Sequence, residues 1–186
     1  FKGANVTLPY KEKALELVDV ADPLSLKVGA VNTIRVSDKG LLYGSNTDGY
    51  GFIENLNAGA PHWRGDKGIA VVIGAGGAAR SIVYALLDTG LSVRLVNRTT
   101  ERAEELAAQC GGSIRVFSWD SREEILNDAS LLVNATKLGM AGEDPLILSL
   151  DSLPLTAIVT DAVYTPLTTD LLRQAARRGN KVVDGL

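Results

Sequence analysis

Two side chains near the start of the sequence, Lys11 and Asp48, are of types that move protons between an enzyme and its substrate. Lys11 falls in the first turn of a helix expected over residues 9–18, where the positive end of the helix dipole disfavours a cation, so its position there is unusual. Asp48 directly precedes a helix expected near residues 51–58, where a simple N-cap is the alternative role. If the fold brings both to one carbonyl or hydroxyl group, they form a proton-transfer pair, but their spacing alone leaves this open.

A glycine-rich segment with the pattern G-x-G-x-x-A follows later in the chain: Gly74-Ala75-Gly76-Gly77-Ala78-Ala79. An expected strand over residues 69–73 precedes it, and an expected helix over residues 78–88 follows it. Gly74 permits a tight turn, Gly76 lets the backbone approach a pyrophosphate, and Ala79 allows close helix–strand packing. The start of the helix then offers unpaired N–H groups to the phosphates. This context favours a dinucleotide-binding loop over a structural turn, and it predicts hydride transfer.

The end of the expected second strand indicates which dinucleotide binds. An NAD site usually carries Asp or Glu about 20 residues after the loop begins, bonded to the ribose 2′-hydroxyl. Here the sequence has Asn97-Arg98-Thr99, with Arg102 one helical turn later. A guanidinium at this position favours a 2′-phosphate through charge-assisted hydrogen bonds. We therefore predict NADP(H) as the cofactor, with a solvated arginine pair at a helix start as the alternative.

Clusters of amide and hydroxyl side chains surround the two proton-transfer candidates: Asn5-Val6-Thr7, Asn32-Thr33 and Asn46-Thr47-Asp48-Gly49. Asn and Thr near Gly commonly cap helices or form turns, which is the ordinary role of each cluster taken singly. Because hydride transfer needs a substrate beside the cofactor, we expect the substrate to lie against this part of the chain.

The elements that must position these residues alternate between short apolar strands and helices from residue 66 onward. Most of the strands are rich in β-branched residues, as in parallel sheets that are buried on both faces. We expect strands over residues 69–73, 92–96, 114–117, 131–133, 157–160 and 181–183, and helices over 78–88, 100–109, 121–127 and 168–178. This alternation predicts right-handed βαβ units in an α/β fold with a doubly wound, Rossmann-type parallel sheet.

The first 48 residues have a different texture, since short apolar runs are mixed with polar, turn-forming clusters. Pro9 is expected in the first turn of the first helix, with Thr7 as its cap. Residues 31–36 and 41–44 are expected to pair as a β-hairpin. We therefore predict three parts: 1–48 as part of a smaller α/β substrate domain, 49–65 as a linker helix and loop, and 66–186 as the dinucleotide-binding domain.

Composition excludes several other classes of protein. The chain has 186 residues and a net charge of −3, which argues against nucleic-acid binding. With 46% hydrophobic and 22% charged residues it is of ordinary globular composition, and no apolar run approaches the ~18 residues of a membrane span. One cysteine, Cys110, and one histidine, His62, exclude a disulfide framework, a thiolate zinc site and multi-histidine metal sites, and they fit a reducing, cytoplasmic location.

Several motifs, in order along essentially the whole chain, carry a resemblance to a known family. Besides the dinucleotide loop and the residues after the second strand, they are Gly3-Ala4-Asn5-Val6-Thr7-Leu8-Pro9-Tyr10-Lys11, Gly29-Ala30-Val31-Asn32-Thr33, Gly44-Ser45-Asn46-Thr47-Asp48-Gly49, Asn134-Ala135-Thr136, Leu138-Gly139-Met140 and Asp161-Ala162-Val163-Tyr164. Together they resemble the shikimate dehydrogenase family, whose NADP-dependent enzymes act in the aromatic amino-acid, or chorismate, pathway.

The resemblance implies a Rossmann domain and a substrate domain with the active site between them, and reduction of 3-dehydroshikimate to shikimate by NADPH. It implies that Lys11 and Asp48 are the catalytic pair. It implies substrate contacts from Asn5, Thr7, Asn32 and Tyr164. It implies cofactor contacts from Gly74, Ala75, Gly76, Gly77 and Ala78, from Asn97, Arg98, Thr99 and Arg102 at the 2′-phosphate, and from Thr136, Met140 and Gly185 toward the nicotinamide.

The sequence also departs from the family pattern. Lys137 stands where the family usually has Pro, so it either perturbs the nicotinamide or points outward. The chain begins at Phe1 rather than Met, and we expect a fragment cut at both ends. The resemblance then implies that a Ser-x-Ser segment holding the substrate carboxylate would precede Phe1, and that a substrate-contacting Gln would follow Leu186. We expect the isolated chain to bind NADP(H) but to turn over poorly.

Three other functions stay open on the sequence. An NAD-dependent quinate/shikimate dehydrogenase is one, and Arg98 counts against it. A methylenetetrahydrofolate or glutamyl-tRNA type of reductase is the second, but it leaves the motifs at residues 5–11 and 46–48 unexplained. The third is a non-catalytic NADP-binding homologue, which Lys137 and the missing ends favour. The oligomeric state is also open.

Overall fold

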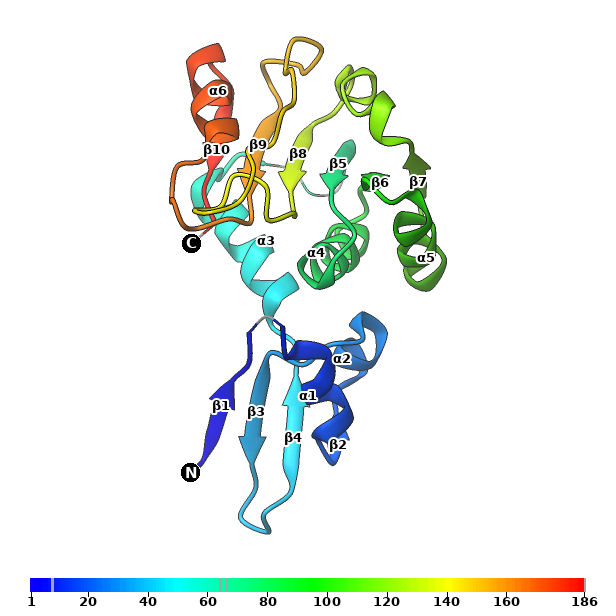
Figure 1. Ribbon diagram of the computed structural model, residues 1–186, viewed down its shortest axis with the longest axis vertical. Coiled ribbons are helices and arrows are strands. Elements are labelled where there is room, and N and C mark those ends of the chain that lie inside the picture. The colour runs from blue at the N-terminus through cyan, green and yellow to red at the C-terminus, as the bar shows by residue number, and fades with distance from the viewer. Residues whose placement is uncertain (8, 64, 66, 186) are drawn as a thin grey trace.

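The computed structural model describes residues 1–7, 9–63, 65 and 67–185, which form two sheets at opposite ends of the molecule (Figure 1). Four positions lie outside the described residues: Leu8 and Leu186, and within or at the bound of the expected linker, Arg64 and Asp66. Within the described part of the chain, no helix has the length and apolar character needed to cross a membrane.

The larger sheet contains six parallel strands in the order β10-β9-β8-β5-β6-β7. The strands are β5 (Ile69–Ile73), β6 (Ser92–Val96), β7 (Ile114–Phe117), β8 (Leu131–Asn134), β9 (Ile158–Asp161) and β10 (Lys181–Val183). The order reverses between β5 and β8, as in a doubly wound dinucleotide-binding sheet. The expected α/β class and the expected strands are therefore confirmed.

Helices and loops cover both faces of this sheet (Figure 1). The helices are α4 (Gly77–Asp88), α5 (Thr100–Cys110) and α6 (Asp170–Arg178). Leu86 of α4 and Leu106 of α5 are buried in the core on one face, together with Leu95 of β6. On the other face, Leu172 of α6 is buried with Leu150 from the long connection between β8 and β9. Each face thus buries its apolar side chains, which explains why the strands are apolar throughout.

The prediction of a helix over residues 121–127 is wrong. Two 3₁₀ turns occupy this region, η1 (Trp119–Ser121) and η2 (Glu124–Leu126). The guanidinium of Arg94 donates a hydrogen bond of 2.7 Å to the Ile125 carbonyl and also pairs with Asp128. Arg94 of β6 thus satisfies a carbonyl in the last turn of this segment, which forms two short turns in place of one helix.

The smaller sheet contains four strands in the order β1-β3-β4-β2 and carries two short helices. Its elements are β1 (Gly3–Asn5), α1 (Lys11–Leu17), β2 (Val20–Ala21), α2 (Pro23–Val28), β3 (Thr33–Val36) and β4 (Leu42–Ser45). β3 and β4 are antiparallel neighbours, so the expected hairpin is confirmed. β1 pairs with β3 and β2 pairs in parallel with β4.

The start of α1 differs from the expectation. The helix begins at Lys11 rather than at Pro9, and Tyr10 occupies the N-cap position. Thr7 is not the cap, because its carbonyl accepts the N–H of Tyr10 at 2.9 Å and closes a turn ahead of the helix. Pro9, with its fixed φ, belongs to that turn. Lys11 nevertheless stands in the first turn, as expected.

A long helix, α3 (Asp48–Gly59), connects the two sheets (Figure 1). It begins at Asp48 rather than near residue 51. It packs on the larger sheet's side of the molecule, where Leu56 is fully buried in the core. Its Asn55 side chain donates a hydrogen bond of 2.6 Å to the Asp184 carbonyl, just after β10. The proposed domain boundaries stay a prediction, but the packing of α3 ties it to the dinucleotide-binding part.

Candidate active site

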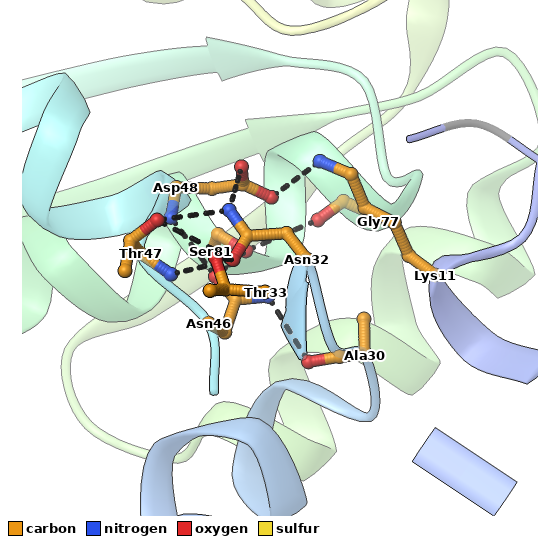
Figure 2. A network of polar contacts seen from close by, with 9 residues as sticks. All are labelled: Lys11, Ala30, Asn32, Thr33, Asn46, Thr47, Asp48, Gly77 and Ser81. Atoms are coloured by element: carbon orange, nitrogen blue, oxygen red, sulfur yellow. Dashed lines mark hydrogen bonds and ion pairs between the residues drawn. The ribbon is translucent and has the colours of Figure 1, made fainter. Parts of the chain in front are cut away.

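The side chains of Lys11 and Asp48 meet, although 37 positions separate them in the chain (Figure 2). Nζ of Lys11 lies 2.6 Å from Oδ2 of Asp48. Each is the first residue of its helix, Lys11 of α1 and Asp48 of α3. The side chains are only 17% and 26% exposed, so the pair is partly shielded from solvent and remains reachable by a small molecule.

Asn32 holds the other carboxylate oxygen of Asp48. Its Nδ2 donates to Oδ1 of Asp48 at 2.7 Å and to Oγ1 of Thr47 at 3.1 Å. Its own Oδ1 accepts hydrogen bonds from the Thr47 backbone N–H at 3.1 Å and from the Thr33 hydroxyl at 2.9 Å. Each oxygen of Asp48 therefore has its own donor, which fixes the carboxylate in one orientation toward the lysine.

Buried Asn46 connects this network to the larger sheet's domain (Figure 2). Its Oδ1 accepts the backbone N–H of Asp48 at 3.0 Å, and its Nδ2 donates to the Ala30 carbonyl at 3.1 Å. The hydroxyl of Ser81, in α4, donates to the same Oδ1 at 3.4 Å. The sequence interpretation assigned Asn46 no role of its own, although an amide before Thr-Asp is a turn signal. It missed Ser81, which no sequence pattern marked.

The expected substrate contacts divide into two groups. Asn5 and Thr7 lie beside the network, since the intervening Val6 N–H donates to the Asn32 carbonyl at 2.7 Å, and both side chains are exposed. Tyr164 follows β9 at the larger sheet and is 60% exposed. Among the described residues, no polar contact joins Tyr164 to the network. The structure thus gathers three of the four residues, and their contacts to substrate stay a proposal.

The glycine-rich loop has the shape that a pyrophosphate requires. Gly74 has φ of +116°, which L side chains rarely adopt, and a Cβ there would lie 2.9 Å from a carbonyl oxygen after β8. A Cβ built on Gly76 or Gly77 would have no heavy atom of the described residues within 4 Å. Gly76 is the N-cap of α4 and has no side chain to occupy the first N–H groups. Ala75 and Ala78, both half-buried, complete a cradle that fits the phosphates.

The residues expected at the 2′-phosphate lie next to this loop. The Gly74 N–H donates to the carbonyl at the end of β6, directly before Asn97. The Asn97 side chain donates to the Thr99 carbonyl at 2.8 Å, which shapes the turn before α5. Arg98 and Arg102 are exposed, and neither guanidinium forms an ion pair with any residue that the structure describes. Two unneutralised cations beside a phosphate cradle fit an additional anionic group.

The residues expected near the nicotinamide lie at the same edge of the sheet. The Thr136 hydroxyl and N–H both donate to Oδ1 of Asn134, at 2.7 and 3.1 Å. Met140 is half-buried in the following turn. Gly185 lies against the Val163 carbonyl, where a Cβ would come within 2.7 Å of the oxygen. Only glycine fits this close approach.

The side chain of Lys137 extends into solvent and reaches another residue of the same loop. Its Nζ lies 3.6 Å from Oε1 of Glu143, and its side chain is 65% exposed. Its carbonyl accepts the Met140 N–H at 3.0 Å, so the loop closes a turn without the proline that the family pattern has there. Its exposed side chain fits the outward one of the two outcomes expected for this lysine, and its effect on the nicotinamide stays a prediction.

Comparison with known proteins places these motifs in one family. Residues 63–143 match the family described as shikimate / quinate 5-dehydrogenase, and residues 1–34 match the shikimate dehydrogenase substrate binding domain. The NADP(+) shikimate dehydrogenase of Paramagnetospirillum magneticum is 54% identical over 100% of this chain and 68% of its own length. That of Dinoroseobacter shibae is 52% identical over 100% of this chain and 67% of its own.

Solved structures agree with this result. Shikimate 5-dehydrogenase from Thermus thermophilus in complex with NADP(H) and shikimate is 41% identical, with a TM-score of 0.87 over 100% of this chain and 67% of that one. Quinate dehydrogenase from Corynebacterium glutamicum in complex with NAD is 31% identical, with a TM-score of 0.91 over 100% of this chain and 67% of that one.

Proposed function

The chain belongs to the shikimate dehydrogenase family, and we propose that it performs the reaction for which its relatives are named, the NADP(H)-dependent interconversion of 3-dehydroshikimate and shikimate. One observation carries this proposal. The 2.6 Å ion pair between Lys11 and Asp48 supplies a proton donor and an orienting carboxylate at one point. The helix that carries Asp48 packs beside the helix that begins at the dinucleotide loop.

Lys11 provides the proton. When the ketone carbon of the substrate is reduced, negative charge develops on its oxygen, and a group within ~3 Å must neutralise it. The ammonium group of Lys11 donates a proton to that oxygen, and the amine accepts it again in the reverse reaction. Asp48 holds the ammonium in place and balances its charge, and Asn32 holds Asp48.

The other residues of the smaller sheet bind the substrate. Asn5, Thr7 and Asn32 offer amide and hydroxyl groups close to Lys11, where they pair with substrate hydroxyl or carboxylate oxygens. Tyr164 approaches from the larger sheet. This division across two sheets orients the carbon to be reduced toward the cofactor.

NADP(H) supplies hydride transfer when it is bound. Residues 74–78 hold its pyrophosphate in the open cradle at the start of α4. Asn97, Arg98, Thr99 and Arg102 hold the 2′-phosphate. Thr136, Met140 and Gly185 line the nicotinamide. The exposed guanidinium groups of Arg98 and Arg102, which form no ion pair within the described part of the chain, favour NADP(H) over NAD(H), and so favour this function over an NAD-dependent quinate dehydrogenase. We propose the cytoplasm as the location, because a chain with one cysteine forms no internal disulfide and is suited to a reducing compartment.

The test is turnover in a chimera, in which these 186 residues replace the matching residues of the Paramagnetospirillum magneticum relative. We expect NADPH to form from shikimate and NADP⁺, and to form more slowly when NAD⁺ or quinate replaces one reactant. A folded chimera that binds NADPH but converts only quinate with NAD⁺, or neither substrate, would contradict the proposal.

A further inference from the structure

A buried carboxylate outside the Lys11 network remains without a function. Asp161, the last residue of β9, is 1% exposed and takes no part in the chemistry proposed above. Burial raises the pKa of its carboxyl group above the ordinary value, because desolvation penalises the charged form more than its hydrogen bonds favour it. A group that is this unfavourable to bury indicates a specific need for its two oxygens at this point.

Three donors from three different segments converge on Asp161. Its Oδ1 accepts hydrogen bonds from Nδ2 of Asn134 at 2.9 Å and from the Val163 backbone N–H at 3.0 Å. Its Oδ2 accepts the hydroxyl of Thr169 at 2.7 Å. Asn134 ends β8, Val163 lies in the turn after β9, and Thr169 is the N-cap of α6. Asp161 therefore joins the segments that follow two neighbouring strands to the start of a helix.

The turn after β8 is held through Asn134. The Asn134 side chain also donates to the Leu138 carbonyl at 3.0 Å and accepts both the N–H and the hydroxyl of Thr136. The Leu138 N–H donates in turn to the Thr136 hydroxyl at 3.0 Å. Thr136, a proposed cofactor contact, is thus two hydrogen bonds away from Asp161.

The other two proposed nicotinamide contacts also border this cluster. A Cβ on Gly185 would lie 2.9 Å from the carbonyl oxygen of Asp161, so Gly185 packs directly on its backbone. A Cβ on Gly139, the neighbour of Met140, would lie 3.7 Å from Thr169. Every segment expected to face the nicotinamide therefore contacts Asp161 or one of its hydrogen-bond partners.

From this convergence we propose that Asp161 is a positioning residue, whose carboxylate fixes Thr136, Met140 and Gly185 in the arrangement that receives the nicotinamide half of the cofactor. The inference rests on the proposed function, since it assumes that NADP(H) binds at this edge. Alanine at position 161 would leave three donors without an acceptor. Asparagine at position 161 keeps an oxygen that accepts from Asn134 and Val163. Its amide NH₂ can donate to the Thr169 hydroxyl, which rotates to accept.

The experiment compares two ligands on the 186-residue chain. NADPH contacts the whole site, and its nicotinamide fluorescence reports on the environment of that ring. Adenosine 2′,5′-bisphosphate contacts only the adenosine side. The variants are Asp161→Ala and Asp161→Asn. The matched control is Asn180→Ala, because buried Asn180 donates to the Pro154 and Ala157 carbonyls at the opposite edge of the same strands.

We expect Asp161→Ala to weaken NADPH binding about tenfold or more and to abolish the fluorescence change, with adenosine 2′,5′-bisphosphate binding unchanged. Asp161→Asn restores NADPH binding, and Asn180→Ala lowers stability without separating the two ligands. The inference would be overturned if Asp161→Ala weakened the binding of both ligands equally or left NADPH binding unchanged. It would also be overturned if Asn180→Ala weakened NADPH binding alone.

A second variant and the binding of both ligands to the wild-type chain complete the experiment. If Asp161→Ala does not fold, Thr169→Val removes one donor at nearly the same volume and is expected to separate the two ligands in the same direction. A wild-type chain that binds neither ligand would count against the proposed function itself. A wild-type chain that binds both, with variants that do the same, would count against Asp161 alone.

Discussion

Gly49, the second residue of α3, packs directly against Ser81 of α4, since a Cβ added to Gly49 would lie 2.8 Å from the Ser81 carbonyl oxygen and 3.1 Å from Cβ of Ala85. The residue before Gly49 is Asp48, and α4 begins at the dinucleotide loop. The two halves of the proposed site therefore touch through backbone, with the hydrogen bond from Ser81 to Asn46 beside the contact. This contact sets how far the ion pair lies from the loop.

Gly49→Ala is therefore expected to destabilise the protein, although alanine usually improves a helix. Its methyl group would push α3 from α4, and overpacking of this kind costs about 1–3 kcal/mol. Chemical denaturation measures the change. Gly51→Ala is the matched control in the same helix, because its Cβ would meet no described heavy atom within 4 Å. The free energy of unfolding of this control is expected to rise by about 0.5–1 kcal/mol. Similar effects of both variants would contradict the close contact.

Arg98→Ala tests the choice of cofactor. Loss of a charge-assisted hydrogen bond of about 1.5–3 kcal/mol should weaken NADP⁺ binding by roughly 10–150-fold and leave NAD⁺ binding unchanged. Calorimetric titration of wild type and variant gives the Kd for NADP⁺ and for NAD⁺, and the ratio of the two shows the preference. Arg35→Ala is the control for loss of charge, since Arg35 stacks on Tyr43 in the smaller sheet. Equal weakening of NADP⁺ and NAD⁺ by Arg98→Ala would remove Arg98 from the 2′-phosphate site.

The pair between Arg94 and Asp128 predicts a pH dependence of stability. The Arg94 guanidinium holds the pKa of the Asp128 carboxyl below its usual value. The stabilisation is therefore complete above the unfolded-state pKa of about 4 and is lost as the pH falls through the folded-state value. Because the Asp128 side chain is 55% exposed, solvent screening limits the gain to less than about 1 kcal/mol.

Thermal melts of wild type and Asp128→Asn at several pH values measure this effect. We expect a gap in Tm near neutral pH that closes in acid and narrows in high salt. Asp120→Asn, which removes an exposed carboxylate from the same connection, should show no such gap. A gap for Asp128→Asn that persists unchanged in acid would contradict the assignment.

The isolated 186-residue chain is expected to bind NADPH but to oxidise shikimate far more slowly than the chimera does. It spans 68% of the Paramagnetospirillum magneticum relative, so any group that orients the substrate from the uncovered third of that relative is present only in the chimera. Missing orientation of this kind costs about 10²-fold or more in rate. Stopped assays with equal protein concentrations compare the two forms. Comparable turnover would show that residues 1–186 contain every group that the reaction needs.

The strands and the dinucleotide loop could be predicted because their signals are local. β-branched runs such as residues 69–73 specify buried strands, and the loop before Gly77 is defined by adjacent glycines. The two short turns in place of a helix over 121–127 could not be predicted, and their contact with Arg94 comes from another strand, which local periodicity does not encode. The prediction that Thr7 caps the first helix is wrong because a turn separates Thr7 from the start of the helix at Lys11.

The candidate site was predictable only as separate pieces. Lys11 and Asp48 stand out by their helix positions, but their meeting depends on how the β3–β4 hairpin folds back, which spacing does not encode. Asp161 carries no local signal of its partners, since Asn134 and Thr169 reach it from other segments. Long-range hydrogen bonds of this kind become visible only in the folded chain.

The most direct measurement of the central claim is kcat for Lys11→Ala in the chimera, with Lys13→Ala as the control. Lys13 lies in the same helix and pairs with Glu16 at the surface. If Lys11 supplies the proton, kcat should fall by about 10²–10⁴-fold with a smaller change in KM, and Lys13→Ala should match wild type. A wild-type kcat for Lys11→Ala would contradict the account.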